Sequence, residues 1–142
     1  MLKILIAVDG SEHANRAIEA VGRMARSSVE LEATLLSVSP EPIIYGGPSA
    51  ATMARFEEDQ KKQQTEILAK AMAHAKSQGL TLTEPARAHG VIAQEILRIA
   101  GELQADQIAI GSRGLGAIDS LIMGSVSQRV IRESPVPVLL VR

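Results

Sequence analysis

A glycine- and serine-rich segment in the last third of the chain carries residue types that can hold phosphate. Gly111 and Gly114 follow an apolar run, and Gly124 precedes Ser125 and Ser127 where a helical pattern begins. Glycine has no Cβ to keep a ligand away, so successive backbone N–H groups can line one anion-binding concavity. The helix start adds N–H groups and a favourable dipole, and the two serine hydroxyls are further donors. The segment therefore predicts a phosphate site.

The same residues also have an explanation that needs no ligand. Ser125 with Gln128 three residues later forms a capping box, and glycines in a loop can simply make turns. Their position favours a ligand, since they follow the carboxyl end of a predicted strand, where open α/β sheets bind ligands. Two known phosphate-binding motifs are missing, which narrows the type of site. A P-loop is disfavoured because GxxxxGK[ST] is missing, and a dinucleotide fingerprint because Asp119 stands where the third glycine belongs.

The elements that must position this segment alternate between strand and helix. Short aliphatic runs predict strands, and apolar residues at three- and four-residue spacing predict helices. Such alternation implies a doubly wound α/β fold, an open five-stranded parallel sheet with helices on both faces, formed by one domain over residues 1–142. A Pro- and Gly-rich loop, which we expect to be mobile, covers residues 39–49. The predicted strands are 2–8, 31–38, 80–88, 106–110 and 136–141; the predicted helices are 11–26, 52–78, 91–103 and one from about 125.

Composition excludes several classes of function. Fifteen basic and sixteen acidic residues give a net charge of −1, and aromatic residues make up 1% of the chain, which argues against a nucleic-acid partner. With no cysteine there is no disulfide framework and no thiolate site. No apolar run approaches the ~18 residues of a membrane span. We therefore expect a soluble, cytoplasmic protein that does not insert into membranes.

The last predicted strand is expected at an edge of the sheet. It contains Pro137, which cannot donate a ladder hydrogen bond. An apolar edge strand either pairs with another chain or is covered by its own preceding helix, and the sequence leaves both open.

The spacing Gly111, Gly114, Gly124, Ser125 also fits the pattern of Gly, two residues, Gly, nine residues, Gly, then Ser or Thr. In this the chain resembles the ATP-binding universal stress proteins. The similarity extends over essentially the whole chain and includes residues 6–11, 90–92, 105–106 and 134–141. The resemblance implies the strand order 3-2-1-4-5, which brings the ends of the first and fourth strands together.

The resemblance also implies a set of contacts to an adenine nucleotide. Asp9 and Val38 would hold the adenine side, although Asp9 can alternatively be an N-cap that forms a box with Glu12. Arg113 would pair with phosphate or remain a solvated loop residue. The residues implied for phosphate and ribose are Gly111, Gly114, Gly124, Ser125, Val126 and Ser127.

The function implied is that of an ATP-dependent regulatory switch in the stress response, with ADP or AMP as other ligands. It would act as a homodimer joined from Val136 to Val141 and serve an unidentified protein client. No convincing catalytic base is present, since His13, His74 and His89 are scattered, so catalysis is left open and is at most slow ATP hydrolysis. Asp119 would bind Mg²⁺ through water or be a solvated turn residue. The alternatives are a slow ATP hydrolase and a dimeric interaction protein that binds no nucleotide.

Overall fold

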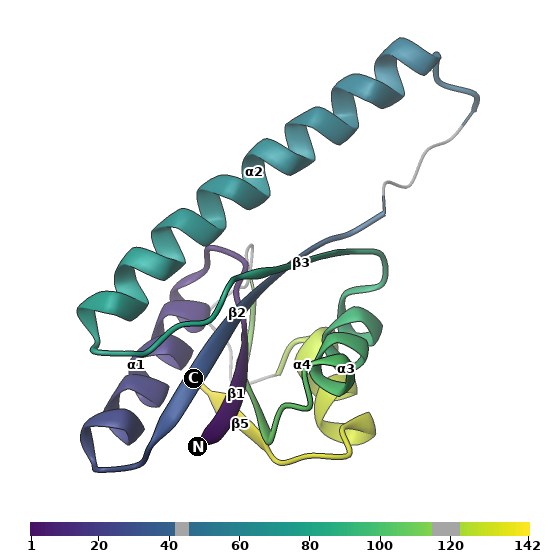
Figure 1. The fold of residues 1–142 in the computed structure, drawn as a ribbon. Helices are drawn as coiled ribbons and strands as arrows, with labels where there is room; N and C mark the ends of the chain where they lie inside the picture. Colours follow the sequence, from purple (N-terminus) through teal and green to yellow (C-terminus); the bar gives the residue numbers. More distant parts are fainter. Residues whose placement is uncertain (42–45, 115–122) are drawn as a thin grey trace.

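Strands and helices alternate along the chain, as the sequence predicts (Figure 1). The computed structural model describes residues 1–41, 46–114 and 123–142. The elements within these residues are β1 (Leu2–Ala7), α1 (Glu12–Arg26), β2 (Leu31–Ser39), α2 (Ala50–Ser77), β3 (Ala86–His89), α3 (Ile92–Glu102), β4 (Gln107–Gly111), α4 (Ser125–Glu133) and β5 (Val138–Val141).

The strands form one parallel sheet in the order β3-β2-β1-β4-β5, which confirms the expected fold class. β1 lies at the centre, where Leu2 is paired with Leu31 of β2 and Ile4 with Gln107 of β4. The chain order reverses between β1 and β4. In doubly wound sheets this switch point opens a crevice at the carboxyl ends of the strands, which is where ligands bind.

The core has two layers, one on each face of the sheet. Helices α1 and α2 cover one face, and α3 and α4 cover the other (Figure 1). Along β1 the side chains alternate: Ile4 and Ile6 pack with α1 and α2, whereas Leu5 packs with α3 and α4. All three are almost fully buried, so the central strand is apolar on both faces, as is typical of parallel sheets.

β3 is shorter than the predicted strand at residues 80–88. The regular strand begins at Ala86, directly after Pro85, which has no N–H to donate to the ladder. Before the proline, Leu82 forms an isolated parallel bridge with Ala33 of β2. The predicted segment thus lies beside β2 over most of its length, but the proline interrupts the pairing.

β5 lies at the edge of the sheet, as predicted from Pro137. The strand begins at Val138, one residue after the proline, and the Pro137 carbonyl accepts a hydrogen bond from the N–H of Ile108 at 3.0 Å. The carbonyl of the proline therefore takes part in the ladder, while its nitrogen, which has no hydrogen to donate, lies just before the regular strand.

Helix α2 is the longest of the described elements, and only part of it rests on the sheet. Leu68, Ala71 and Ala75 in its second half are buried, whereas its first half extends past the end of the sheet (Figure 1). The helix is followed by Gly79 at φ +81°, the left-handed residue expected there. None of the described helices is long and apolar enough to cross a membrane.

Side chains of α2 tie the helix to the strand ends. The Gln64 amide donates to the carbonyl oxygens of Ser37 and Ala88, both at 3.0 Å, and so bridges the ends of β2 and β3. One turn earlier, the Gln60 amide donates to the Pro40 carbonyl at 2.9 Å. Because Gln64 is buried, its two bonds are shielded from water and fix where α2 lies above the sheet.

Candidate functional site

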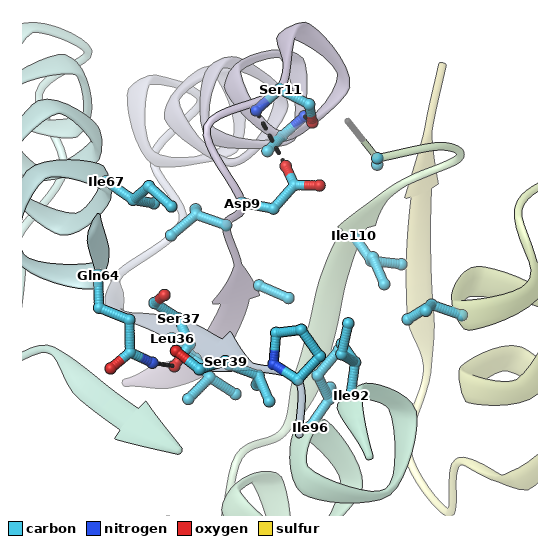
Figure 2. A pocket seen from close by; sticks show the side chains of 18 of the residues that line it. Asp9, Ser11, Leu36, Ser37, Ser39, Gln64, Ile67, Ile92, Ile96 and Ile110 are labelled. Carbon is cyan, nitrogen blue, oxygen red and sulfur yellow. Dashed lines mark hydrogen bonds between the residues drawn. The ribbon is translucent and has the colours of Figure 1, made fainter. Parts of the chain in front are cut away.

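A pocket of about 770 Å³ opens at the carboxyl ends of β1, β2 and β4, at the switch point of the sheet. Figure 2 shows Gln64 and Ile67 on one side of it, Ile110 on another, and Ile92 and Ile96 below. Every site residue named from the sequence lies on its wall: Asp9, Val38, Gly111, Arg113, Gly114, Gly124, Ser125, Val126 and Ser127. The structure therefore brings together residues that are more than 100 positions apart in the chain.

Asp9 does not cap helix α1, so the proposed box with Glu12 is wrong. The N-cap is Ser11, whose hydroxyl accepts the N–H of Ala14 at 3.2 Å. Asp9 Oδ1 accepts the N–H of Ser11 at 2.9 Å, which holds the carboxylate beside the pocket (Figure 2). Gly10, at a φ of +84°, turns the chain between Asp9 and the helix, so that Ser11 and not Asp9 is the N-cap.

Helix α4 begins with its amides at the pocket. Its N-cap is Gly124, without a side-chain hydrogen bond, so the capping box of Ser125 and Gln128 is also wrong. Gln128 instead donates through its side-chain amide to the Met123 carbonyl at 2.9 Å. The first helical amides have no acceptor within the helix, and in α4 they belong to pocket-lining residues. A helix start placed in this way is suited to an anion.

The carbonyl oxygen of Ser112 joins the two described ends of the glycine-rich loop. It accepts the Gly124 N–H at 2.8 Å and the Ser127 hydroxyl at 2.9 Å. The Ser127 hydroxyl also lies 2.9 Å from the Gly124 carbonyl, so its proton is directed at backbone oxygens. The hydroxyl that the sequence suggested as a ligand donor therefore holds the loop.

The three glycines of the motif serve by leaving space, since none of them has a left-handed φ. A Cβ at Gly111 would lie 2.7 Å from the His13 backbone, where α1 packs against β4. A Cβ at Gly114 would lie 2.5 Å from Asp9 Oδ2, whereas at Gly124 the nearest atom would be the Ser112 carbonyl oxygen at 3.4 Å. The protein thus has room for a side chain at Gly124 alone among the three.

We expect Gly114→Ala and Asp9→Ala to be coupled, because the new methyl group and the carboxylate would occupy the same space. Gly114→Ala alone must displace a carboxylate that is held by the Ser11 amide. In the Asp9→Ala background the methyl group of Gly114→Ala meets no carboxylate. There Gly114→Ala should lower the free energy of unfolding by about 1 kcal/mol less than it does in the wild type. Urea unfolding of the wild type, both single variants and the double variant measures this term. Strictly additive effects would contradict the contact.

One wall of the pocket was not foreseen from the sequence. It consists of α2 residues at helical spacing, namely Phe56, Asp59, Gln60, Gln63, Gln64 and Ile67. The available signal was this i, i+3, i+4, i+7 pattern in the predicted helix at residues 52–78. Polar glutamines at those positions concealed it, because apolar spacing is what identifies a buried face.

The histidines named from the sequence lie elsewhere. Among the described residues that line the pocket, none is histidine. His13 Nδ1 lies 3.3 Å from the Ser112 hydroxyl behind the loop, and His74 pairs with Glu19 between α1 and α2. Asp119, the candidate for Mg²⁺, lies outside the described residues. Within the part of the chain that is described, no three His, Cys, Asp or Glu side chains form a group that could hold a metal ion.

The perturbed ionisable pair is on α3, outside the pocket wall. A hydrogen bond from Arg98 holds the pKa of Glu95 below its usual value, and the same bond raises the pKa of Arg98. Arg98 is exposed and Glu95 is half-buried, and the two lie one turn apart on α3, so this pair stabilises one helix face and does not point to a catalytic group.

Comparison with known proteins extends over the full chain. The model of the universal stress protein family matches residues 1–142. A universal stress protein of Thermus aquaticus is 37% identical over 140 residues, covering 98% of this chain and 97% of its own. The universal stress protein UspA of Lactobacillus plantarum shares the fold, with a TM-score of 0.82, 19% identity, and coverage of 99% and 97%. A universal stress protein solved in complex with cAMP has a TM-score of 0.69 and 25% identity, with coverage of 99% and 96%.

Proposed function

We propose that this chain, which belongs to the universal stress protein family, binds an adenine nucleotide in the pocket at the switch point of its sheet. The ligand is ATP, or else ADP or AMP, and its binding switches the state of a cytoplasmic single-domain protein in the stress response. The observation that carries the proposal is that all nine residues expected to contact a nucleotide line one pocket. The related protein in complex with cAMP supports an adenine-containing ligand.

The pocket offers different chemistry at its two ends, which suits a nucleotide. At the α4 end, the first-turn amides and the space left by Gly124 fit an anionic group that must approach the backbone closely. At the β2 end, Val8, Val38 and Ile96 provide an aliphatic surface for a flat base. The Asp9 carboxylate lies between them and is an acceptor for ribose hydroxyls.

The first test is to identify the ligand that the protein carries. The protein is purified without added nucleotide and denatured, and any released small molecule is identified by mass spectrometry, with calorimetric titration of ATP, ADP and AMP alongside. We expect an adenine nucleotide or micromolar binding. If there is neither a released ligand nor heat of binding, the nucleotide proposal is wrong and the dimeric interaction protein becomes the better hypothesis.

The switch and the hydrolase differ in what happens to bound ATP. A switch leaves ATP intact, whereas a hydrolase releases phosphate when Mg²⁺ is present. If the chain itself is the hydrolase, the rate of phosphate release is proportional to protein concentration and survives repeated purification. Phosphate release from the purified protein measures the difference, and sustained turnover would replace the switch by the slow hydrolase.

We also propose that the protein is a homodimer joined through the edge strand β5. Its residues are each partly exposed, and a parallel edge strand leaves backbone groups open to a second chain. Val138→Lys places a charge in that contact and is expected to shift the protein to monomer, as seen by light scattering. Ile131→Lys, at an exposed apolar residue of α4, is the control. A dimer that persists in Val138→Lys would exclude this interface.

A further inference from the structure

Phe56 is an unusual residue for this chain. The sequence has one phenylalanine, one tyrosine and no tryptophan, and the two core layers are aliphatic. The ring of Phe56 is nevertheless left 38% exposed on α2, where it lines the pocket. A partly exposed aromatic ring that lines a pocket is available for contact with a molecule bound there.

The helix that carries Phe56 is held in a fixed position. Gln60, one turn along, bonds the Pro40 carbonyl, and Gln64, two turns along, bonds the ends of β2 and β3. Phe56, Gln60 and Gln64 repeat every four residues, so they share one face of the helix, and all three line the pocket. The ring therefore lines the pocket from a helix whose backbone is anchored one and two turns along.

The two long walls of the pocket belong to opposite faces of the sheet. Helices α4 and α2 lie on opposite faces of the sheet (Figure 1). Helix α4 contributes the residues of its first turn to the pocket, and α2 contributes Phe56. A nucleotide with its phosphates at the start of α4 has its base directed toward β2 and α2. Asp59, Gln60 and Gln63 are polar groups on the same wall as Phe56.

We infer that Phe56 stacks on the base of the nucleotide, so that α2 supplies the base-recognition wall of the pocket. The inference rests on the proposed function and adds to it that α2 contacts the base of the nucleotide. Stacking uses the face of a base, so the ring distinguishes nucleotides from phosphates that lack a base, and its effect is greatest for the larger purines.

Substitutions at Phe56 separate stacking from simple apolar contact. Phe56→Ala is expected to weaken ATP and AMP binding about 5- to 20-fold in calorimetry, in the range of base–aromatic stacking at a partly exposed site. Phe56→Tyr should keep the affinity, and Phe56→Leu should lose most of it. Binding of tripolyphosphate, which has no base, should be the same in all variants. Ile131→Ala, which removes an apolar side chain of similar exposure (40%) outside the pocket, should change nothing.

Because the sequence has no tryptophan, a tryptophan placed at position 56 reports on nucleotide binding by its fluorescence. Phe56→Trp introduces a single tryptophan, whose fluorescence should change with ATP and AMP but not with tripolyphosphate. If the wild type binds ATP while Phe56→Ala and Phe56→Leu bind equally well, the stacking inference is overturned and the proposed function stands. If the wild type binds no nucleotide at all, the proposed function and the inference fail together.

Discussion

Replacing Gly124 with valine is expected to weaken ATP binding about 100-fold, equivalent to about 2.7 kcal/mol, while the protein stays folded. The reason is that the position has space in the protein but faces the pocket. A Cβ there would meet the Ser112 carbonyl oxygen at 3.4 Å, an ordinary contact, and the side chain would enter the region in front of the first amides of α4. A bound phosphate needs the same region.

Calorimetry with ATP measures the affinity of Gly124→Val, and thermal unfolding checks its fold. Valine is a poorer N-cap than glycine, so a loss of stability of about 1 kcal/mol is expected even without a ligand. Gly101→Val is the matched control, because Gly101 lies on α3 with open space around it and outside the pocket. Equal ATP affinity in wild type and Gly124→Val would remove α4 from the proposed site.

The second large effect is expected at Gly111, where even alanine should lower the free energy of unfolding by about 2–3 kcal/mol. A Cβ would lie 2.7 Å from the carbonyl carbon of His13 and 2.9 Å from its carbonyl oxygen. Those atoms are backbone in the first turn of α1, so relief requires the helix and β4 to move apart. Denaturant unfolding measures the loss.

Gly101→Ala gives the corresponding control, with the opposite sign expected. In the open space on α3 the alanine should stabilise the helix by about 0.5–1 kcal/mol through its higher helix propensity. If Gly111→Ala were as stable as the wild type, the close packing of α1 on β4 would not contribute to the stability of the fold. The two predictions together assign different roles to two glycines of one motif: packing at Gly111 and ligand access at Gly124.

The fold was predictable because its signals are local. Aliphatic runs such as Ile4 to Ile6 indicated strands buried on both faces, and the strand order came from the family resemblance. The errors arose where two similar residues compete for one role. Asp9 and Ser11 are both good N-caps, and spacing alone does not show that the turn at Gly10 delays the helix until after Ser11.

The pocket was predictable only on the sides formed by strand ends and the glycine motif. The α2 wall depends on how a long helix crosses the sheet, which is set by bonds such as those from Gln64 to Ser37 and Ala88. These partners are 27 and 24 residues away, and no pattern within α2 reveals them. Tertiary contacts of this kind decide which face of a polar helix meets a ligand.

The pairing of β1 with β4 has a consequence for how the protein is made. Ile4 at the centre of the sheet is paired with Gln107, so β1 keeps one edge unsatisfied until the ribosome has added about 100 residues, roughly 5–20 s of synthesis. During that time the nascent chain has an open, apolar strand edge that can pair wrongly or recruit a chaperone. The pocket is completed later still, with α4, so any molecule that binds in it can assist only the last step of folding.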